Sequence, residues 1–237
     1  MGLTETEKSS TPDHARRVRE MFARISPRYD VLNHLLSANI HKRWRQKVVQ
    51  RLRPLLPVNA RVLDVGCGTG DLSIAIFEKT VAQVVGIDFC RPMLELATKK
   101  APQLAFIEGD ALKLPFVDAS FDAVTIAFAL RNLVSTDQGL IELKRVLKPQ
   151  GWLFVLEFSK PVIPGIHELI ELYYRYLLPW IGGWLSGSRS AYEYLPDSIA
   201  RFPDQQTLAR MLRAAGFGEV EFENLSGGIA ALHTGRK

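Results

Sequence analysis

The sequence predicts an α/β fold in which helices cover both faces of a doubly wound, mostly parallel sheet. The first observation is an apolar, β-branched run at Arg61–Val65, typical of a buried strand, which a glycine-rich turn joins to an amphipathic helix beginning at Asp71. The second is that apolar runs and amphipathic segments alternate along the rest of the chain. The third is a length of 237 residues with 47% hydrophobic residues, enough for one such domain with a substantial core.

A single domain is expected over residues 13–237, after a polar tail at residues 1–12 that we expect to be disordered. No stretch approaches the roughly 18 uncharged apolar residues of a membrane span, and the N-terminus lacks the apolar run of a secretory signal. Cys67 and Cys90 are too few for a disulfide framework, and neither they nor the five scattered histidines have the spacing of a metal site. We therefore expect a cytoplasmic protein that uses no metal ion.

Amphipathic helices over residues 13–57 are predicted to form a cap that precedes the first strand and covers a substrate pocket. The first helix ends at Ile25, Ser26 is expected to be the N-cap of the second with Pro27 in its first turn, and the third ends near Pro54. The net charge is +5, and the positive residues concentrate in this cap: Arg16, Arg17, Arg19, Arg24, Arg28, Lys42, Arg43, Arg45, Lys47, Arg51 and Arg53. A solvated helix face and contact with an anionic membrane explain this concentration equally well.

The turn after the first strand has glycine at alternate positions, Gly66, Gly68 and Gly70. Glycine lets a ligand approach the backbone closely and tolerates positive φ angles. The spacing differs from the G-x-G-x-x-G of dinucleotide sites, and no Gly-Lys-Ser/Thr follows to form a P-loop. Asp88 ends the second strand 18 residues after Gly70, where an acid can accept hydrogen bonds from ribose hydroxyls. The alternative is a structural glycine turn beside a surface aspartate.

Asp110 follows the third predicted strand, Leu104–Glu108, after a helix at residues 91–100. The carboxyl ends of parallel strands border the ligand crevice of an open α/β sheet, so Asp110 and the backbone of Ala111 are candidates to bind an adenine amino group. A turn-forming aspartate is the alternative. The fourth strand, at residues 121–127, continues into an apolar segment that ends at Asn132.

The pattern Asp64-x-Gly66-x-Gly68-x-Gly70, with Asp88, resembles the cofactor site of class I S-adenosylmethionine methyltransferases. This resemblance implies a Rossmann-like sheet of seven strands whose last strand is antiparallel. It also implies that Ala127 stands where many relatives have a serine that touches the cofactor. The residues implied to bind S-adenosylmethionine are Asp64, Gly66, Gly68, Thr69, Gly70, Asp88, Asp110, Ala111 and Ala127.

Three further segments resemble the ubiquinone and menaquinone biosynthesis C-methyltransferases: residues 29–44, residues 128–132, which read Phe-Ala-Leu-Arg-Asn, and residues 145–159. The resemblance implies that the methyl acceptor is a ring carbon of demethylmenaquinol, with a ubiquinone-pathway benzoquinol or demethylphylloquinol as alternatives. Consistent with this, residues 128–132 contain neither the Asn/Asp-Pro-Pro-Tyr/Phe of nucleobase and glutamine N-methyltransferases nor the Pro-Cys of cytosine C5 enzymes.

Arg131 is the candidate catalytic cation implied by this resemblance, because a nearby positive charge favours the phenolate that makes a quinol ring carbon nucleophilic. Asn132 is the candidate to orient a quinol hydroxyl. A salt bridge that holds a loop is an equally good explanation of Arg131. The general base stays open between Tyr194, Tyr29 and His41.

Residues 160–200 interrupt the alternation of strands and helices with an apolar, aromatic segment that includes Trp180 and Trp184. It is either additional core or a wall that covers an aromatic ring with a prenyl tail, and a prenylated naphthoquinol is the expected partner. A helix near residues 204–215, ended by Gly216, and two last strands complete the prediction.

Other functions remain open at this point. An RNA or protein methyltransferase is favoured only by the basic charge, and an inactive cofactor-binding scaffold has the same glycine loop. We expect no nucleic-acid partner and possible peripheral membrane contact, and the sequence leaves the oligomeric state open.

Overall fold

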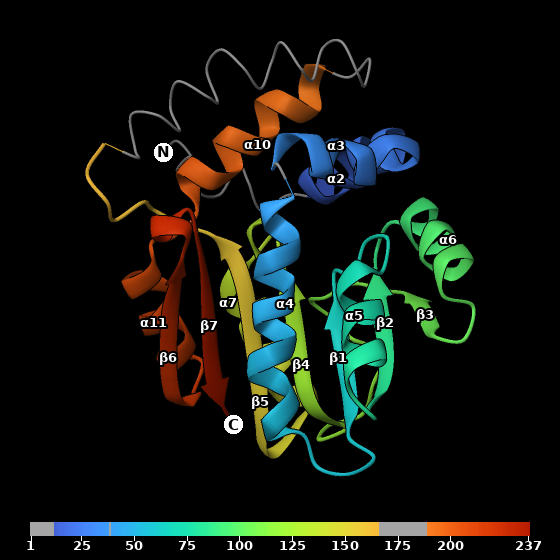
Figure 1. Cartoon of the computed structure of the whole chain (residues 1–237), viewed down its shortest axis with the longest axis vertical. Coiled ribbons are helices and arrows are strands. Elements are labelled where there is room, and N and C mark those ends of the chain that lie inside the picture. Colours follow the sequence, from blue (N-terminus) through green and yellow to red (C-terminus); the bar gives the residue numbers. More distant parts are fainter. Residues whose placement is uncertain (1–11, 38, 166–188) are drawn as a thin grey trace.

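The computed structural model describes residues 12–37, 39–165 and 189–237, which fold around one mixed sheet (Figure 1). Within these residues the sheet has seven strands in the order β3-β2-β1-β4-β5-β7-β6. The first five strands in this order run parallel, whereas β7 lies antiparallel between β5 and β6. The strands are β1 (Arg61–Val65), β2 (Gln83–Asp88), β3 (Ala105–Glu108), β4 (Phe121–Ala127), β5 (Leu147–Phe158), β6 (Gly218–Leu225) and β7 (Ala230–Arg236). The predicted seven-stranded, doubly wound sheet with an antiparallel last strand is confirmed.

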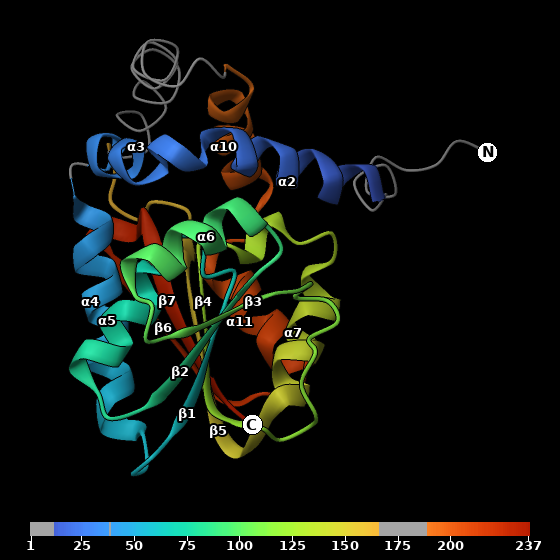
Figure 2. The same cartoon turned by 90° about the vertical axis from the view of Figure 1, so that its right-hand side faces the viewer.

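Helices cover both faces of the sheet, with α4 and α5 on one face and α7 and α11 on the other (Figure 2). The helices α2, α3 and α10 form a cap across the edge toward which the parallel strands point (Figure 1). The described helices are α2 (Pro12–Ile25), α3 (Tyr29–Leu36), α4 (Ile40–Leu52), α5 (Asp71–Lys79), α6 (Arg91–Lys100), α7 (Thr136–Val146), α10 (Arg189–Arg201) and α11 (Gln205–Ala214). The helical N-terminal region is therefore confirmed, and its helices α2 and α3 lie over the edge where open α/β sheets bind ligands. The third helix of the predicted cap, α4, instead packs on a face of the sheet, because its apolar side meets the strands there.

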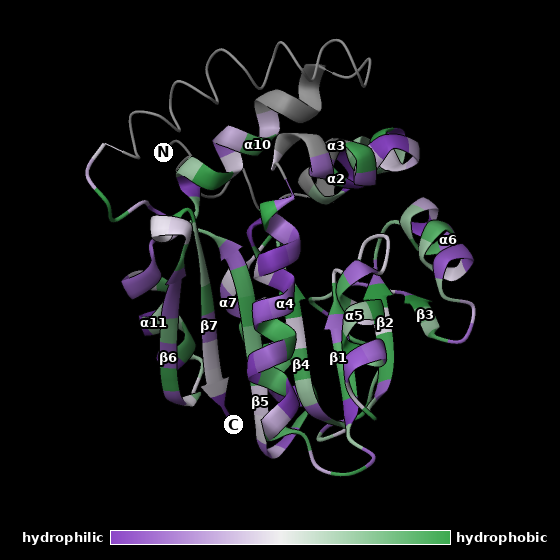
Figure 3. Cartoon of the chain, viewed as in Figure 1, coloured by the Kyte–Doolittle hydropathy of each residue, from purple (hydrophilic) through white to green (hydrophobic). Residues whose placement is uncertain are grey.

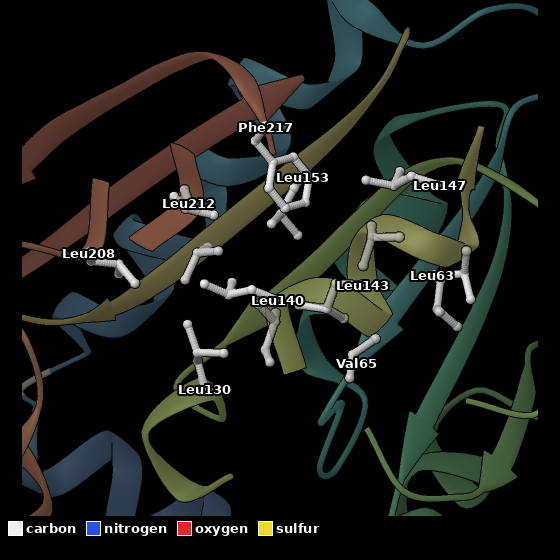
Figure 4. Packing of buried hydrophobic residues seen from close by; sticks show 14 of the residues in the cluster. Leu63, Val65, Leu130, Leu140, Leu143, Leu147, Leu153, Leu208, Leu212 and Phe217 are labelled. Atoms are coloured by element: carbon white, nitrogen blue, oxygen red, sulfur yellow. The ribbon is translucent and has the colours of Figure 1, made fainter. Parts of the chain in front are cut away.

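Two hydrophobic clusters hold the layers together. On one face, leucines of α7 and α11, such as Leu140 and Leu212, pack on β1, β4 and β5 (Figure 4). On the other face, Trp44 and Val48 of α4 and Ile76 of α5 pack against the opposite sides of the strands. The strands are mostly hydrophobic while the outer side of α4 is hydrophilic (Figure 3). The buried faces fix both helix layers, and so fix the strand ends that carry the site.

Ser26 is not the N-cap that the sequence predicts. Its Oγ donates a hydrogen bond to the carbonyl of Ala23 at 2.9 Å, and a short 3-10 helix, Ser26–Arg28, leads directly into α3. Ile25 already has right-handed helical angles, so the backbone continues to turn and presents no new helix start at Ser26. The predicted cap is wrong because it requires an extended residue at that position.

The predicted turn at Pro149–Gly151 is an irregularity inside β5. Phe121 of β4 pairs with Leu147, and Ala123 pairs with Trp152, so the intervening residues of β5 bulge out. The strand therefore begins before the turn that the sequence places ahead of it. At the end of α11 the prediction is confirmed, because Gly216 has φ +87° and its N–H donates to the carbonyl of Arg213.

Part of the predicted domain plan lies outside the described residues. These parts are residues 1–11 of the predicted tail and residues 166–188 of the predicted substrate-covering insertion, including Trp180 and Trp184. The division into tail, cap and insertion thus stays a prediction. Among the helices of residues 12–37, 39–165 and 189–237, none combines the length and apolar character that crossing a membrane requires.

Candidate active site

A cavity of about 570 Å³ lies at the carboxyl ends of β1, β2, β3 and β4, below the cap. It brings together seven of the residues predicted from sequence, which come from four different strand ends. They are Gly66, Gly68, Asp88, Asp110, Ala111, Ala127 and Asn132. Cap residues, among them Arg19, Phe22 and Tyr29, form the opposite wall. The topology thus gathers at one edge of the sheet residues that are far apart in the sequence.

The glycine loop has positive φ angles at Gly66 (+63°), Gly68 (+56°) and Gly70 (+82°). A Cβ at Gly66 would lie 2.3 Å from the Cβ of Ala129, so the loop touches the segment that follows β4. A Cβ at Gly68 would meet nothing within 4 Å, which leaves its backbone open to the cavity. Gly70 is not among the residues that line this cavity or the small pocket described below. It precedes α5 and lies against the ring of Phe106.

Asp88 holds the loop and faces the cavity. Its two carboxylate oxygens accept hydrogen bonds from the backbone N–H groups of Gly68 (2.8 Å) and Cys90 (2.9 Å). Burial raises the pKa of Asp88, and these backbone donors oppose the shift. Each oxygen keeps a further lone pair that a ligand hydroxyl can use. Asp110 is exposed beside Ala111 and accepts from the backbone N–H of Leu112 at 2.9 Å.

A second, smaller pocket of about 30 Å³ adjoins the cavity, and Gly66, Gly68, Tyr29, Ala127 and Phe128 line both. The small pocket also brings together two predicted residues, Asp64 and Thr69, with one that the sequence analysis missed, Arg45.

Arg45 Nη1 lies 2.6 Å from Asp71 Oδ2 at the start of α5. This arginine directly follows the segment 29–44 that resembles a family signature, but a helical arginine among many others gave no signal of its own. Its cation suits an anionic ligand group in this pocket.

Asp64 is almost fully buried, and it accepts hydrogen bonds from the hydroxyls of Ser73 (2.6 Å) and Thr125 (2.7 Å). Burial outweighs these donors and raises its pKa from 3.8 to about 6. At pH values between 3.8 and about 6, the folded protein thus retains a proton that the unfolded chain releases.

Exchanging Asp64 for asparagine is expected to flatten the pH dependence of stability. As pH rises from 3.8 to above 6, the free energy of unfolding of the unmodified protein should fall by up to about 3 kcal/mol relative to Asp64→Asn, because the raised folded pKa makes ionisation costly. Urea unfolding of both proteins across this range measures the difference. A difference that does not change with pH would contradict the prediction.

Arg131 lies in a buried ion pair rather than on the cavity wall. Its Nη1 is 2.8 Å from Glu157 Oε1 and donates to the carbonyl of Phe128 at 2.6 Å, and its side chain is 6% exposed. The salt bridge that the sequence allowed as an explanation of Arg131 is thus present, and an electrostatic role in catalysis stays a prediction. Glu157, which the sequence analysis missed, is a lone acid within an apolar strand, and burial raises its pKa despite Arg131.

Asn132 and Tyr194 meet although 62 residues separate them. The hydroxyl of Tyr194 donates to Asn132 Oδ1 at 2.9 Å, and Asn132 lines the cavity. Burial raises the pKa of Tyr194, which keeps the phenol protonated as a donor. Of the other base candidates, Tyr29 lines the cavity. His41 is not one of the residues that line the cavity in the described part of the chain. Its pKa is lowered to about 4, mainly by burial and to a smaller extent by the charge of Arg45.

Residues 10–237 match the ubiE/COQ5 methyltransferase family. The chain belongs to this family. The demethylmenaquinone methyltransferase of Thermus thermophilus is 46% identical over 220 residues, covering 91% of this chain and 99% of that protein. The ubiquinone/menaquinone biosynthesis C-methyltransferase of Citrifermentans bemidjiense is 43% identical, covering 93% and 96%.

Solved structures support the same fold for this ubiE/COQ5 family member. An S-adenosylmethionine-dependent methyltransferase of Thermotoga maritima, a possible histamine N-methyltransferase, aligns with a TM-score of 0.66 at 22% identity, covering 92% of this chain and 99% of that one. Together with the family match, this confirms a methyltransferase that uses S-adenosylmethionine. The open backbone at Gly68 and the two carboxylates of Asp88 and Asp110 on the cavity wall are suited to the polar groups of that cofactor. The individual roles of these residues stay predictions.

Proposed function

We propose that this chain transfers the methyl group of S-adenosylmethionine to a ring carbon of demethylmenaquinol, forming menaquinol. The observation that carries the proposal is a cavity with two kinds of wall. Asp88 and Asp110 provide polar contacts on one side, while Phe22, Phe128 and Leu133 offer apolar surface to a flat ring. The names of the relatives, demethylmenaquinone methyltransferase among them, support the same substrate class.

The polar wall would hold the cofactor. Asp88 would accept the ribose hydroxyls, and Asp110 with the backbone of Ala111 would bind the adenine. Asp64 and Thr69, in the small pocket, would seat the methionyl end, and the Ala127 backbone would face the cofactor where both pockets meet. When bound, S-adenosylmethionine supplies a methyl group on a positively charged sulfur, which becomes a neutral thioether as the ring carbon gains the methyl group and loses a proton.

The chain's own part in the chemistry is to orient and polarise the acceptor. Tyr194 fixes the amide of Asn132, whose Nδ2 lies 3.4 Å from the carbonyl of Phe128 and retains a second N–H. That N–H would donate to a quinol oxygen and favour its phenolate form. Arg131 would act with Glu157 by holding the Phe128 carbonyl, and thereby the segment between Ala127 and Asn132. The apolar wall excludes water, and alignment of ring and methyl group provides much of the acceleration.

The test is a methyl-transfer assay followed by mass spectrometry, with short-tailed demethylnaphthoquinol and benzoquinol acceptors offered separately. We expect the naphthoquinol to gain one methyl group faster than the benzoquinol. In the same assay Tyr194→Phe should lower turnover by about tenfold, because the amide of Asn132 loses its hydrogen-bond partner. Cofactor binding without transfer to either quinol would contradict the proposal. Faster transfer to the benzoquinol would move the assignment to the ubiquinone pathway.

Peripheral contact with a membrane is part of this proposal, since a prenylated substrate resides in lipid. The outer side of α4 is hydrophilic and carries exposed Lys42 and Arg43, next to the cap (Figure 3). Basic side chains at such a position favour an anionic lipid surface. Co-sedimentation with phosphatidylglycerol vesicles that weakens as salt increases would support this contact.

A further inference from the structure

A network of charged groups joins the cap to the cofactor loop. Lys100, the last residue of α6, has its Nζ 2.6 Å from Asp30 Oδ2 of α3 and 2.8 Å from Asp71 Oδ1 of α5. The same Nζ donates to Thr69 Oγ1 at 3.0 Å, and Thr69 Oγ1 donates to Asp30 Oδ1 at 2.7 Å. One cation thus connects α3, the glycine loop and α5.

These contacts fix what Thr69 can offer a ligand. A lysine ammonium only donates and a carboxylate only accepts. The hydroxyl hydrogen of Thr69 is therefore directed at Asp30, and one of its lone pairs is used by Lys100. One lone pair of this hydroxyl is unused by these contacts, and Thr69 lines the small pocket, where a ligand group could use it. In this arrangement Thr69 is an acceptor toward the pocket, and its matching ligand group is an N–H donor such as an ammonium.

We infer that Asp30 and Lys100 are positioning residues that set Thr69 as a hydrogen-bond acceptor for the ammonium group at the amino-acid end of the cofactor. This inference rests on the proposed function and adds to it a specificity for that end of the cofactor, supplied from the cap. Arg45, which lines the same pocket and pairs with Asp71, provides the complementary charge for the carboxylate.

The network is partly buried, so its charged contacts are less screened by water than contacts at the surface. The side chains of Lys100, Asp30 and Asp71 are 32%, 29% and 27% exposed. Partial burial by itself would lower the pKa of Lys100, yet the hydrogen bonds to Asp30 and Asp71 prevail and raise it. The ammonium therefore stays charged in place, and its removal leaves the carboxylates of Asp30 and Asp71 without the cation that both contact.

The experiment compares two probes by calorimetry on the full chain: S-adenosylhomocysteine, which has the amino-acid end, and 5′-methylthioadenosine, which lacks it. We expect Lys100→Met to weaken S-adenosylhomocysteine binding by about tenfold and to leave 5′-methylthioadenosine binding within about twofold. Asp30→Asn should act in the same direction, because an amide can no longer only accept. Lys100→Arg should recover part of the loss.

Lys99→Met is the matched control, since Lys99 is an exposed lysine in the same turn of α6 and its replacement should leave both affinities unchanged. If Lys100→Met weakens both probes equally, the residue acts on the fold and the inference is overturned. It is also overturned if neither affinity changes. Should the unmodified protein bind neither probe, the proposed function itself fails, which is a separate result.

Discussion

Replacing Glu157 with leucine is expected to lower the free energy of unfolding by about 3–5 kcal/mol, which is a large part of the stability of a domain. The side chain of Glu157 is 1% exposed and that of Arg131 is 6% exposed, so the substitution leaves a buried guanidinium without its counter-charge. Urea unfolding of the two proteins at neutral pH measures the loss. An effect below about 1 kcal/mol would contradict the expectation.

The double variant Glu157→Leu with Arg131→Met provides the control for this prediction. Removing both charges also removes the desolvation cost, so most of the stability should return. Methyl transfer should nevertheless stay low, because the carbonyl of Phe128 has lost its guanidinium donor. A double variant with restored stability and full activity would show that the pair serves the fold and leaves the reaction untouched. If the double variant recovers neither stability nor activity, the substitutions disturb more of the structure than this ion pair.

Gly66→Ala is expected to reduce methyl transfer by about 100-fold and stability by about 3 kcal/mol. The new methyl group would lie 2.3 Å from the Cβ of Ala129, and the residue has φ +63°. Either the glycine loop or the segment after β4 must move, and both line the cavity. Urea unfolding, calorimetry with S-adenosylhomocysteine and the methyl-transfer assay measure the three consequences.

Gly68→Ala is the matched control because it has a similar φ of +56° but no atom within 4 Å of its new Cβ. Backbone strain alone should cost it about 1 kcal/mol of stability. The methyl group of Gly68→Ala would occupy space at the cavity. We therefore expect the variant to bind the cofactor more weakly while the protein stays folded. Equal losses of stability in the two variants would mean that the contact with Ala129 is not what makes Gly66 necessary.

Most strands and helices were predictable because their residues carry local patterns. β2 and β4 occupy the predicted residues, since each is a short, mostly apolar run rich in β-branched residues. The glycine loop was predictable for the same reason, because positive φ angles restrict the choice of residue. The prediction for Ser26 failed because a serine before a proline is typical of an N-cap, whereas here the backbone stays helical from Ile25 into the 3-10 helix Ser26–Arg28.

Pairings over long sequence distances could not be predicted. Glu157 joins Arg131 across 26 residues, and Lys100 of α6 joins Asp30 of the cap helix α3, but nothing in either local pattern identifies the partner. The meeting of Asn132 and Tyr194 likewise depends on how α10 lies over the sheet edge. Such pairs follow from topology, which the alternation of elements fixes only at the level of layers.

The packing of the first helices on late parts of the sequence has a consequence for synthesis on the ribosome. Trp44 Nε1 donates to Ser226 Oγ across 182 residues, and α2 contacts α10. The apolar faces of these N-terminal helices therefore leave the exit tunnel before the segments that they pack against have been synthesised. They can be buried only after nearly the whole polypeptide has been translated. A truncated nascent chain should accordingly expose them to holding chaperones, and ligand-binding competence should arise only after release.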